Sequence, residues 1–154
     1  PILGICYGMQ LLARELGGEV EKAAVREYGR MEVRPEAGSA LFAGEAPQAA
    51  FQAWMSHGDE TKKVPAGFRI VAKSAQGSLA AIENPEARIF ALQFHPEVTL
   101  DMKEQWTLSA SERLKSPGAQ PRGVHLSMHP LYDPPLDRWI DGFLDRWLAT
   151  DTRP

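Results

Sequence analysis

The sequence predicts an α/β fold in which a mostly parallel β-sheet is flanked by helices. Three patterns support this class: an apolar run over residues 1–5 that passes directly into a helical stripe, a series of strand-like segments between residues 20 and 94, and a second helical stripe near the C-terminus. Because residue 1 is Pro and the apolar run begins at once, we expect the domain to be incomplete at its N-terminus.

The composition is that of one globular domain. The chain has 154 residues, of which 44% are hydrophobic, enough to bury a core. With 17 Lys and Arg against 20 Asp and Glu, the net charge is -3, so we expect no nucleic-acid partner. The single cysteine fits a reducing compartment, and no apolar run is long enough to cross a bilayer. These features predict a cytoplasmic protein with no membrane partner.

The first elements meet at a cysteine. Residues 1–5 are predicted to form a buried strand, and residues 7–16 show the apolar spacing of a helix that ends at Gly17. Cys6 therefore lies at a sharp strand-to-helix junction.

The middle of the chain is predicted to be rich in strands. Residues 20–64 show short strands joined by turns, and an apolar stretch over residues 49–55 ends in a polar turn at 56–59. Three more strands are expected, over residues 68–74, 79–83 and 88–94.

The C-terminal third divides into an irregular part and a helix. Residues 100–132 have no clear apolar period and contain turn signals, so we expect a loop-like segment there, bounded by Pro134 and Pro135. A closing amphipathic helix is predicted over residues 133–150, with its apolar face formed by Leu136, Trp139, Ile140, Phe143, Leu144, Trp147 and Leu148.

Cys6 is the strongest candidate for a catalytic residue. Gly4 and Gly8 flank it symmetrically, a pattern that relieves crowding in a strand-to-helix bend and exposes a nucleophile. At the start of a helix, the sulfur lies near unpaired N–H groups and the positive end of the helix dipole, which favour the reactive thiolate. The backbone N–H of Tyr7 is then expected to contribute to an oxyanion hole.

A cysteine nucleophile also needs a base and a group that orients this base. His95 and Glu97 follow a predicted strand, and an extended backbone, favoured by the intervening proline, places both side chains on the same side. His57 with Asp59 is an alternative pair, but the flexible glycine between them does not hold that geometry. We therefore favour His95 and Glu97.

Metal and phosphate sites are not expected. His125 and His129 have the i, i+4 spacing of a helical zinc pair, but no third ligand is evident and Pro130 follows at once, so a surface turn is the preferred interpretation. The sequence has no glycine-rich phosphate loop, which argues against direct ATP binding, and we predict no cofactor.

The motifs together resemble a known family. GICYGMQLLA, LGG, REYG, LFAG, WMSHGDE, VPAGF, AAIE and LQFHPEVT occur in this order over residues 1–99. They resemble the class I glutamine amidotransferases, and REYG with WMSHGD narrows the similarity to the glutaminase domain of GMP synthetase. The resemblance implies a flavodoxin-like three-layer domain.

The resemblance also implies a reaction. Ammonia would be released from L-glutamine through a γ-glutamyl thioester on Cys6, with His95 as general base and acid and Glu97 as its orienter. In the family, a glycine-rich loop upstream of the cysteine supplies the second oxyanion-hole amide, and an ATP-pyrophosphatase domain or subunit consumes the ammonia. The polar backbone groups of the substrate would lie around three further positions, Gln10, Ser56 and His57.

Two other functions stay open, because residues 100–132 match nothing in the family and Leu100 and Asp101 replace its histidine and threonine. One is a stand-alone relative that hydrolyses another γ-glutamyl compound. The other is a catalytically silent, truncated module that keeps the fold.

Overall fold

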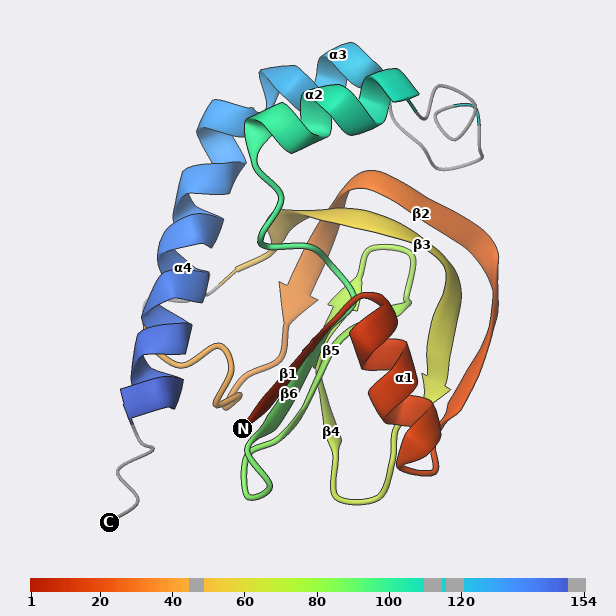
Figure 1. Cartoon of the computed structure of the whole chain (residues 1–154), viewed down its shortest axis with the longest axis vertical. Coiled ribbons are helices and arrows are strands. Elements are labelled where there is room, and N and C mark those ends of the chain that lie inside the picture. Colours follow the sequence, from red (N-terminus) through yellow and green to blue (C-terminus); the bar gives the residue numbers. More distant parts are fainter. Residues whose placement is uncertain (45–48, 110–114, 116–120, 150–154) are drawn as a thin grey trace.

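The computed structural model describes residues 1–44, 49–109, 115 and 121–149. Figure 1 shows a curled sheet with helices on both sides of it. In chain order the elements are β1 (Ile2–Ile5), α1 (Tyr7–Glu15), β2 (Glu19–Pro35), β3 (Phe51–Lys63), β4 (Arg69–Ser74), β5 (Leu79–Asn84), β6 (Ile89–Leu92), α2 (Leu100–Ser109), α3 (Arg122–Ser127) and α4 (His129–Ala149).

The sheet is mixed. Its strand order is β1-β6-β5-β4-β2-β3, and β1 pairs with β6 in parallel from Ile2 opposite Ile89 to Ile5 opposite Leu92. The other pairings among the described strands are antiparallel. The predicted α/β class is therefore confirmed, and the flanking helices with it.

The strand directions correct one part of the prediction. The expected parallel pairing is found only between β1 and β6 in the described part of the chain, and Cys6 follows β1, at one end of the strand order. The reason is connection length: residues 75–78 and 85–88 are hairpin-length links, which join antiparallel neighbours, whereas a parallel pair needs a long crossover. β1 and β6 are separated by residues 6–88, which leaves room for such a crossover.

Residues 20–64 differ from the prediction of short strands and turns. They contain two long strands, β2 with 17 residues and β3 with 13, which pair with each other over most of their length. The predicted polar turn at 56–59 lies inside β3, where His57 is opposite Glu27 in β2. The His57 side chain is buried and contacts the buried Glu27, so local polarity gave a false turn signal.

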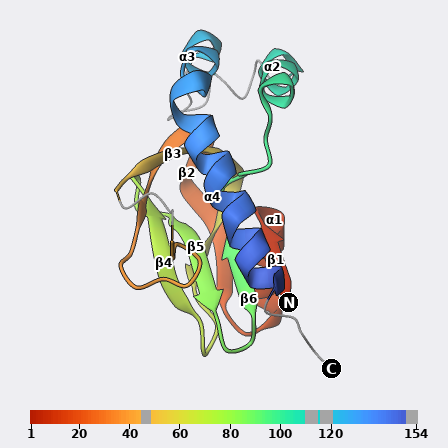
Figure 2. The same ribbon diagram turned by 90° about the vertical axis from the view of Figure 1, so that its left-hand side faces the viewer.

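The helices cover opposite faces of the sheet (Figure 2). In β6, Ala91 packs with Met9 of α1, whereas Phe90 and Leu92 belong to the larger cluster that contains Trp139 of α4. The alternation of side chains along this strand thus produces two core layers. The layers place α1, and with it Cys6, on one side of the sheet and α4 on the other.

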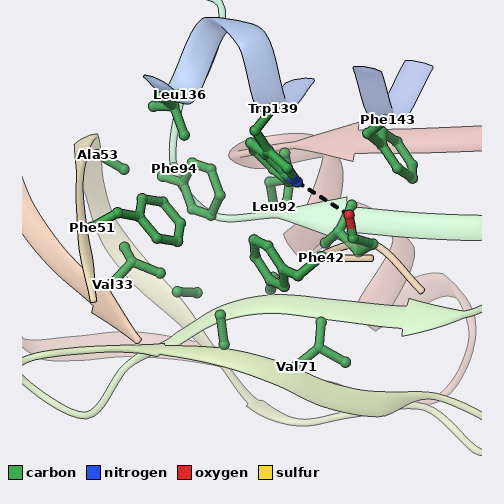
Figure 3. Packing of buried hydrophobic residues seen from close by; sticks show 14 of the residues in the cluster. Val33, Phe42, Phe51, Ala53, Val71, Leu92, Phe94, Leu136, Trp139 and Phe143 are labelled. Atoms are coloured by element: carbon green, nitrogen blue, oxygen red, sulfur yellow. Dashed lines mark hydrogen bonds between the residues drawn. The ribbon is translucent and has the colours of Figure 1, made fainter. Parts of the chain in front are cut away.

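The predicted apolar stripe of the closing helix is confirmed except at Leu148, which is 54% exposed. Trp139 is 1% exposed and packs with Phe42 and Phe51 (Figure 3). Its indole Nε1 donates a hydrogen bond of 3.2 Å to the carbonyl oxygen of Leu41, so the polar edge of the ring is also satisfied. Phe143 is buried farther along the same face.

The region predicted to be loop-like contains helices α2 and α3, and α4 begins at His129, four residues before its predicted start. Pro134 and Pro135 lie inside α4 rather than at a loop boundary. The surface turn expected around His129 is the junction of α3 and α4, and the side chain of His125 lies outside the described residues. Among the described helices, none has the length and apolar character needed to cross a membrane.

A buried ion cluster explains why a proline-containing segment is held as a helix here. The carboxylate of Asp133 receives two hydrogen bonds from the Arg30 guanidinium of β2, at 2.5 and 2.7 Å. Lys103 of α2 and His129 of α4 contact the same carboxylate. Three elements are therefore joined at one charged side chain, which sequence periodicity cannot reveal.

Candidate functional site

Cys6 occupies the bend between β1 and α1. Its backbone has φ 52° and ψ -105°, a left-handed conformation that costs a non-glycine residue about 1–3 kcal/mol. Hydrogen bonds hold it: the Cys6 N–H donates to the carbonyl oxygen of Leu92 at 2.7 Å, and the N–H groups of Met9 and Gln10 donate to the Cys6 carbonyl oxygen at 3.1 and 3.3 Å. Cys6 therefore lies at a strained bend between the strand and the helix.

The two flanking glycines have different reasons to be present. A Cβ at Gly4 would lie 2.7 Å from Cδ1 of Leu12 and 2.8 Å from the carbonyl carbon of Gly8, distances that side chains do not tolerate. A Cβ at Gly8 would meet no described atom within 4 Å. The close approach of strand and helix therefore explains Gly4, and the prediction that both glycines relieve crowding is wrong for Gly8.

The Cys6 sulfur contacts two polar groups from other elements. Its thiol can donate to the carbonyl oxygen of Ser56 at 3.7 Å, and Nε2 of Gln93 donates to the sulfur at 3.6 Å. Tyr7 and Gly8 hold the first two positions of α1, whose backbone N–H groups have no acceptor within the helix. The site therefore offers hydrogen-bond donors around the sulfur.

His95 and Glu97 lie just beyond the end of β6, the strand parallel to β1. The backbone N–H of His95 donates to the carbonyl oxygen of Trp54 at 2.8 Å, which fixes the segment against β3. Nδ1 of the His95 ring is 2.7 Å from Oε1 of Glu97. Because a carboxylate can only accept a hydrogen bond, Nδ1 carries a proton and donates it to Glu97.

The pKa of His95 reflects this arrangement. Burial lowers the pKa, but hydrogen bonds with Cys6 and Glu97, together with the negative charge of both groups, outweigh it and raise the pKa from 6.5 to about 9. The imidazole therefore interacts with both residues that the sequence analysis paired with it.

An aromatic residue also covers His95. Trp106 of α2 contacts the imidazole edge to face, with ring centroids 6.1 Å apart and an interplanar angle of 80°. The sequence analysis did not identify Trp106. A helical pattern was present in the sequence, since Val98, Met102 and Trp106 are spaced at i, i+4 and i+8. In the structure these three side chains pack together against β2 and β3.

The residues predicted to lie around the substrate are mostly engaged within the protein. Nε2 of Gln10 donates to the carbonyl oxygen of Asp59 at 2.8 Å and to Oε1 of Gln93 at 3.1 Å. The His57 ring contacts Glu27 through Nε2 at 2.9 Å and the Asp59 carbonyl oxygen through Nδ1 at 3.0 Å. Of the predicted set, Ser56 brings its carbonyl oxygen to the Cys6 sulfur.

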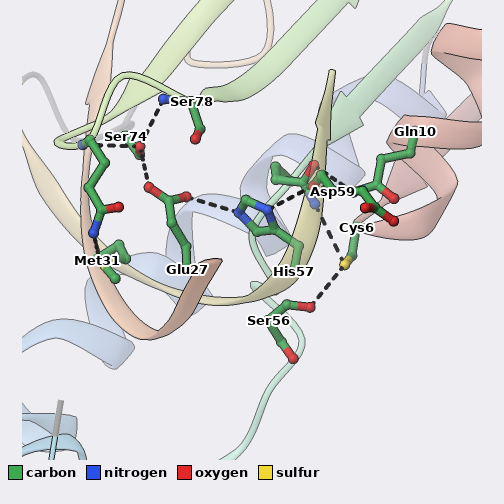
Figure 4. A network of polar contacts seen from close by, with 11 residues as sticks. Cys6, Gln10, Glu27, Met31, Ser56, His57, Asp59, Ser74 and Ser78 are labelled. Atoms are coloured by element: carbon green, nitrogen blue, oxygen red, sulfur yellow. Dashed lines mark hydrogen bonds and ion pairs between the residues drawn. The ribbon is translucent and has the colours of Figure 1, made fainter. Parts of the chain in front are cut away.

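His57 is therefore not placed as a base for Cys6. Its side chain is 2% exposed, and both ring nitrogens have partners within the protein, Glu27 and the Asp59 carbonyl oxygen (Figure 4). Glu27, which is fully buried, also accepts a hydrogen bond of 2.6 Å from the Ser74 hydroxyl. Sequence analysis missed Glu27 and Gln93 because a buried polar residue in a strand looks locally like a solvent-facing one.

A cavity of about 670 Å³ lies beside the candidate site. It is formed by β1, the segment after His95 and α4, and it reaches Glu97 but neither Cys6 nor His95. We therefore do not assign the reacting group to it. Its acidic lining consists of Glu97, Asp101, Asp133, Asp137 and Asp141.

The fold and the site together define a class: an α/β domain with a partly exposed cysteine on a strand-to-helix elbow, beside a histidine held by a carboxylate. The family model described as glutamine amidotransferase class-I matches residues 1–111, a range that includes α2.

Known proteins agree with that class. The GMP synthase (glutamine-hydrolyzing) of Oleidesulfovibrio alaskensis is 50% identical over 98 residues, 64% of this chain and 19% of the relative. A glutamine amido transferase structure from Methylobacillus flagellatus has a TM-score of 0.88 at 22% identity, covering 100% of this chain and 64% of that one. A glutamine amidotransferase structure from Thermotoga maritima has a TM-score of 0.83 at 24% identity, with 96% and 62% covered.

This chain belongs to the class-I glutamine amidotransferase family. It spans about a fifth of the length of the curated relative and about two thirds of the length of the two solved structures.

Proposed function

We propose that this domain hydrolyses the side-chain amide of glutamine and releases ammonia. One observation carries the proposal: the parallel pairing of β1 with β6 brings Cys6 to the same edge of the sheet as the His95–Glu97 pair. Parallel strands end at the same edge, where a substrate can reach both groups.

The geometry supports a thioester route. The Cys6 thiolate attacks the amide carbon and forms a C–S bond, while the backbone N–H of Tyr7 donates to the developing oxyanion. The His95 imidazolium gives its proton to the amide nitrogen, the C–N bond breaks, and ammonia leaves. His95 then removes a proton from water, which attacks the thioester and releases glutamate and the sulfur. Glu97 holds the imidazole through Nδ1 in both steps.

We infer two kinds of role for the predicted substrate-binding residues. Because both amide hydrogens of Gln10 and both ring nitrogens of His57 are used within the protein, we infer that these side chains shape the wall of the site. Contact with the polar groups of glutamine would then fall to backbone atoms near Ser56.

The ammonia acceptor follows from the relatives. Because curated relatives of this chain are named GMP synthase, we propose that the released ammonia is used by an ATP-pyrophosphatase synthetase domain or subunit. The first alternative is a relative that hydrolyses another γ-glutamyl compound, and the second is a silent module that binds without turnover. Substrate profiling with a series of γ-glutamyl amides separates the first alternative, because glutamine should be the preferred substrate.

Ammonia release from glutamine tests the proposal. We expect His95→Ala to lower kcat by about 10²–10⁴-fold, the usual cost of losing a general base, and Glu97→Ala to lower it less, because Glu97 acts through His95. His57→Gln is the matched control and should change thermal stability more than kcat. A larger loss of kcat in His57→Ala than in His95→Ala would overturn the assignment of the base.

A further inference from the structure

Two buried amides connect a backbone carbonyl to the reactive sulfur. Gln10 donates from Nε2 to the Asp59 carbonyl oxygen at 2.8 Å and to Oε1 of Gln93 at 3.1 Å. Gln93 then donates from its own Nε2 to Sγ of Cys6 at 3.6 Å. Gln93 is fully buried and Gln10 is 8% exposed, so neither amide exchanges these partners for bulk water.

The direction of this chain of hydrogen bonds is fixed by its first member. A carbonyl oxygen can only accept, so Gln10 must present its NH₂ group to Asp59. The second hydrogen of that group then points to Gln93, which must present Oε1 to receive it. Gln93 is left with its NH₂ group toward Cys6, so the sulfur always faces a donor.

The Asp59 carbonyl oxygen, at which this series of hydrogen bonds begins, is itself held in place. The Asp59 carbonyl oxygen also contacts Nδ1 of His57 at 3.0 Å, and Nε2 of His57 is 2.9 Å from Glu27 (Figure 4). Glu27 accepts a 2.6 Å hydrogen bond from Ser74, and its side chain is 0% exposed. The acceptor that sets the direction therefore cannot turn away without breaking a buried network.

We propose that Gln93 is a further catalytic residue, a neutral donor that stabilises negative charge on the Cys6 sulfur, and that Gln10 is the positioning residue that sets its direction. Negative charge is on the sulfur twice in the reaction, in the attacking thiolate and when the thioester breaks. The carbonyl oxygen of Ser56, 3.7 Å from the same sulfur, accepts the proton of the thiol and cannot serve either state. This inference rests on the proposed function, because it assigns a role to Cys6 as nucleophile.

The alternative is a purely structural role, in which Gln93 is a core residue whose polar atoms have hydrogen-bond partners. The two interpretations differ in what Gln93→Met should do. Methionine has a similar length and no N–H, so it removes the donor while filling the space. A purely structural role would change stability and leave the reactivity of the sulfur alone.

The test is the rate of Cys6 alkylation by iodoacetamide at a fixed pH, because this reagent reports the sulfur without needing glutaminase activity. We expect Gln93→Met to lower the rate constant about tenfold, and Gln93→Glu at least as much, because its carboxylate turns an acceptor toward the sulfur. Gln105→Met, at an exposed position of α2, should stay within about twofold of the parent. In the glutaminase assay the same loss should appear in kcat with little change in KM.

Two outcomes would overturn the inference. One is an unchanged alkylation rate in folded Gln93→Met, and the other is an equal effect in Gln105→Met. If Gln93→Met does not fold, NMR of the parent gives the answer: alkylating Cys6 should shift the side-chain amide protons of Gln93, and unchanged protons would reject the contact. Rapid iodoacetamide labelling without glutamine turnover in the parent would instead count against the proposed function alone.

Discussion

The conformation of Cys6 is under strain, and its neighbours have to hold it. The left-handed backbone at this residue is stabilised by hydrogen bonds to β6 and from the first turn of α1. Gly4 permits the close packing of strand on helix, since any side chain there meets Leu12 and the backbone of Gly8. The reactive geometry thus depends on a residue with no chemistry of its own.

Substituting the two glycines separately tests this. Gly4→Ala should destabilise the fold by about 1–3 kcal/mol, because the added carbon must displace backbone. Gly8→Ala should be neutral or stabilise by up to about 1 kcal/mol, because it fills open space in a helix. Urea denaturation of both variants measures the difference, and equal effects would contradict the packing account of Gly4.

His95 gives a pH-dependent signature. Its pKa in the folded protein is raised to about 9, above the ordinary 6.5, so the protonated ring stabilises the fold fully below about pH 6.5 and this contribution is lost as the pH rises through about 9. NMR titration of the ring should show that pKa, and Glu97→Gln and Cys6→Ala should each lower it. A titration near 6.5 in the parent protein would contradict the observed contacts.

At the scale of elements, the Asp133 cluster joins β2, α2 and α4. Burial raises the pKa of Asp133, but Arg30 and Lys103 outweigh it and lower the pKa to about 2. The stabilisation is therefore present above the ordinary value of 3.8 and is lost as the pH falls through about 2. Because α2 carries Trp106, the cluster also fixes the aromatic cover of His95.

A pair of substitutions separates the members of this cluster. Asp133→Asn should cost about 3–5 kcal/mol, because it leaves Arg30 and Lys103, whose side chains are 1% and 3% exposed, without the carboxylate. Lys103→Met should cost less than about 1.5 kcal/mol, because Arg30 still pairs with Asp133 through two hydrogen bonds. Thermal unfolding measures both, and a larger loss in Lys103→Met would reject this ranking.

The helices and strands show which parts of the fold could be predicted from sequence patterns. The helix after Cys6, the strands β4 to β6 and the apolar face of α4 were predictable, because each has a period that burial imposes. The length of β3 and the early start of α4 were not. In both places buried polar pairs, His57 with Glu27 and Asp133 with Arg30, stabilise segments whose local composition indicates a turn.

The site shows the same limit. The positions of Cys6, His95 and Glu97 follow from the elbow and from the extended spacing around a proline, which are local. The contact of Gln93 with the sulfur depends on the pairing of β6 with β1, and the engagement of Gln10 depends on β3, so no local pattern could indicate them.

At the scale of the whole molecule, the curled sheet brings residues from the two ends of its strand order to one place. Cys6 comes from one edge of the strand order and Ser56 and His57 from the other, because the sheet curls until β3 reaches the end of β6 (Figure 1). The His95 N–H bond to Trp54 closes this curl. We propose that the result is a nucleophile that recognises glutamine, and not merely a reactive thiol.

Labelling with a diazo-ketone analogue of glutamine, followed by intact-mass and peptide mass spectrometry, tests that claim most directly. Because Cys6 is the single cysteine of the sequence, we predict one adduct per chain at Cys6, slower labelling in His95→Ala, and protection by free glutamine. A chain that reacts with iodoacetamide at Cys6 but forms no adduct with the glutamine analogue, or an adduct that glutamine does not prevent, would contradict the account.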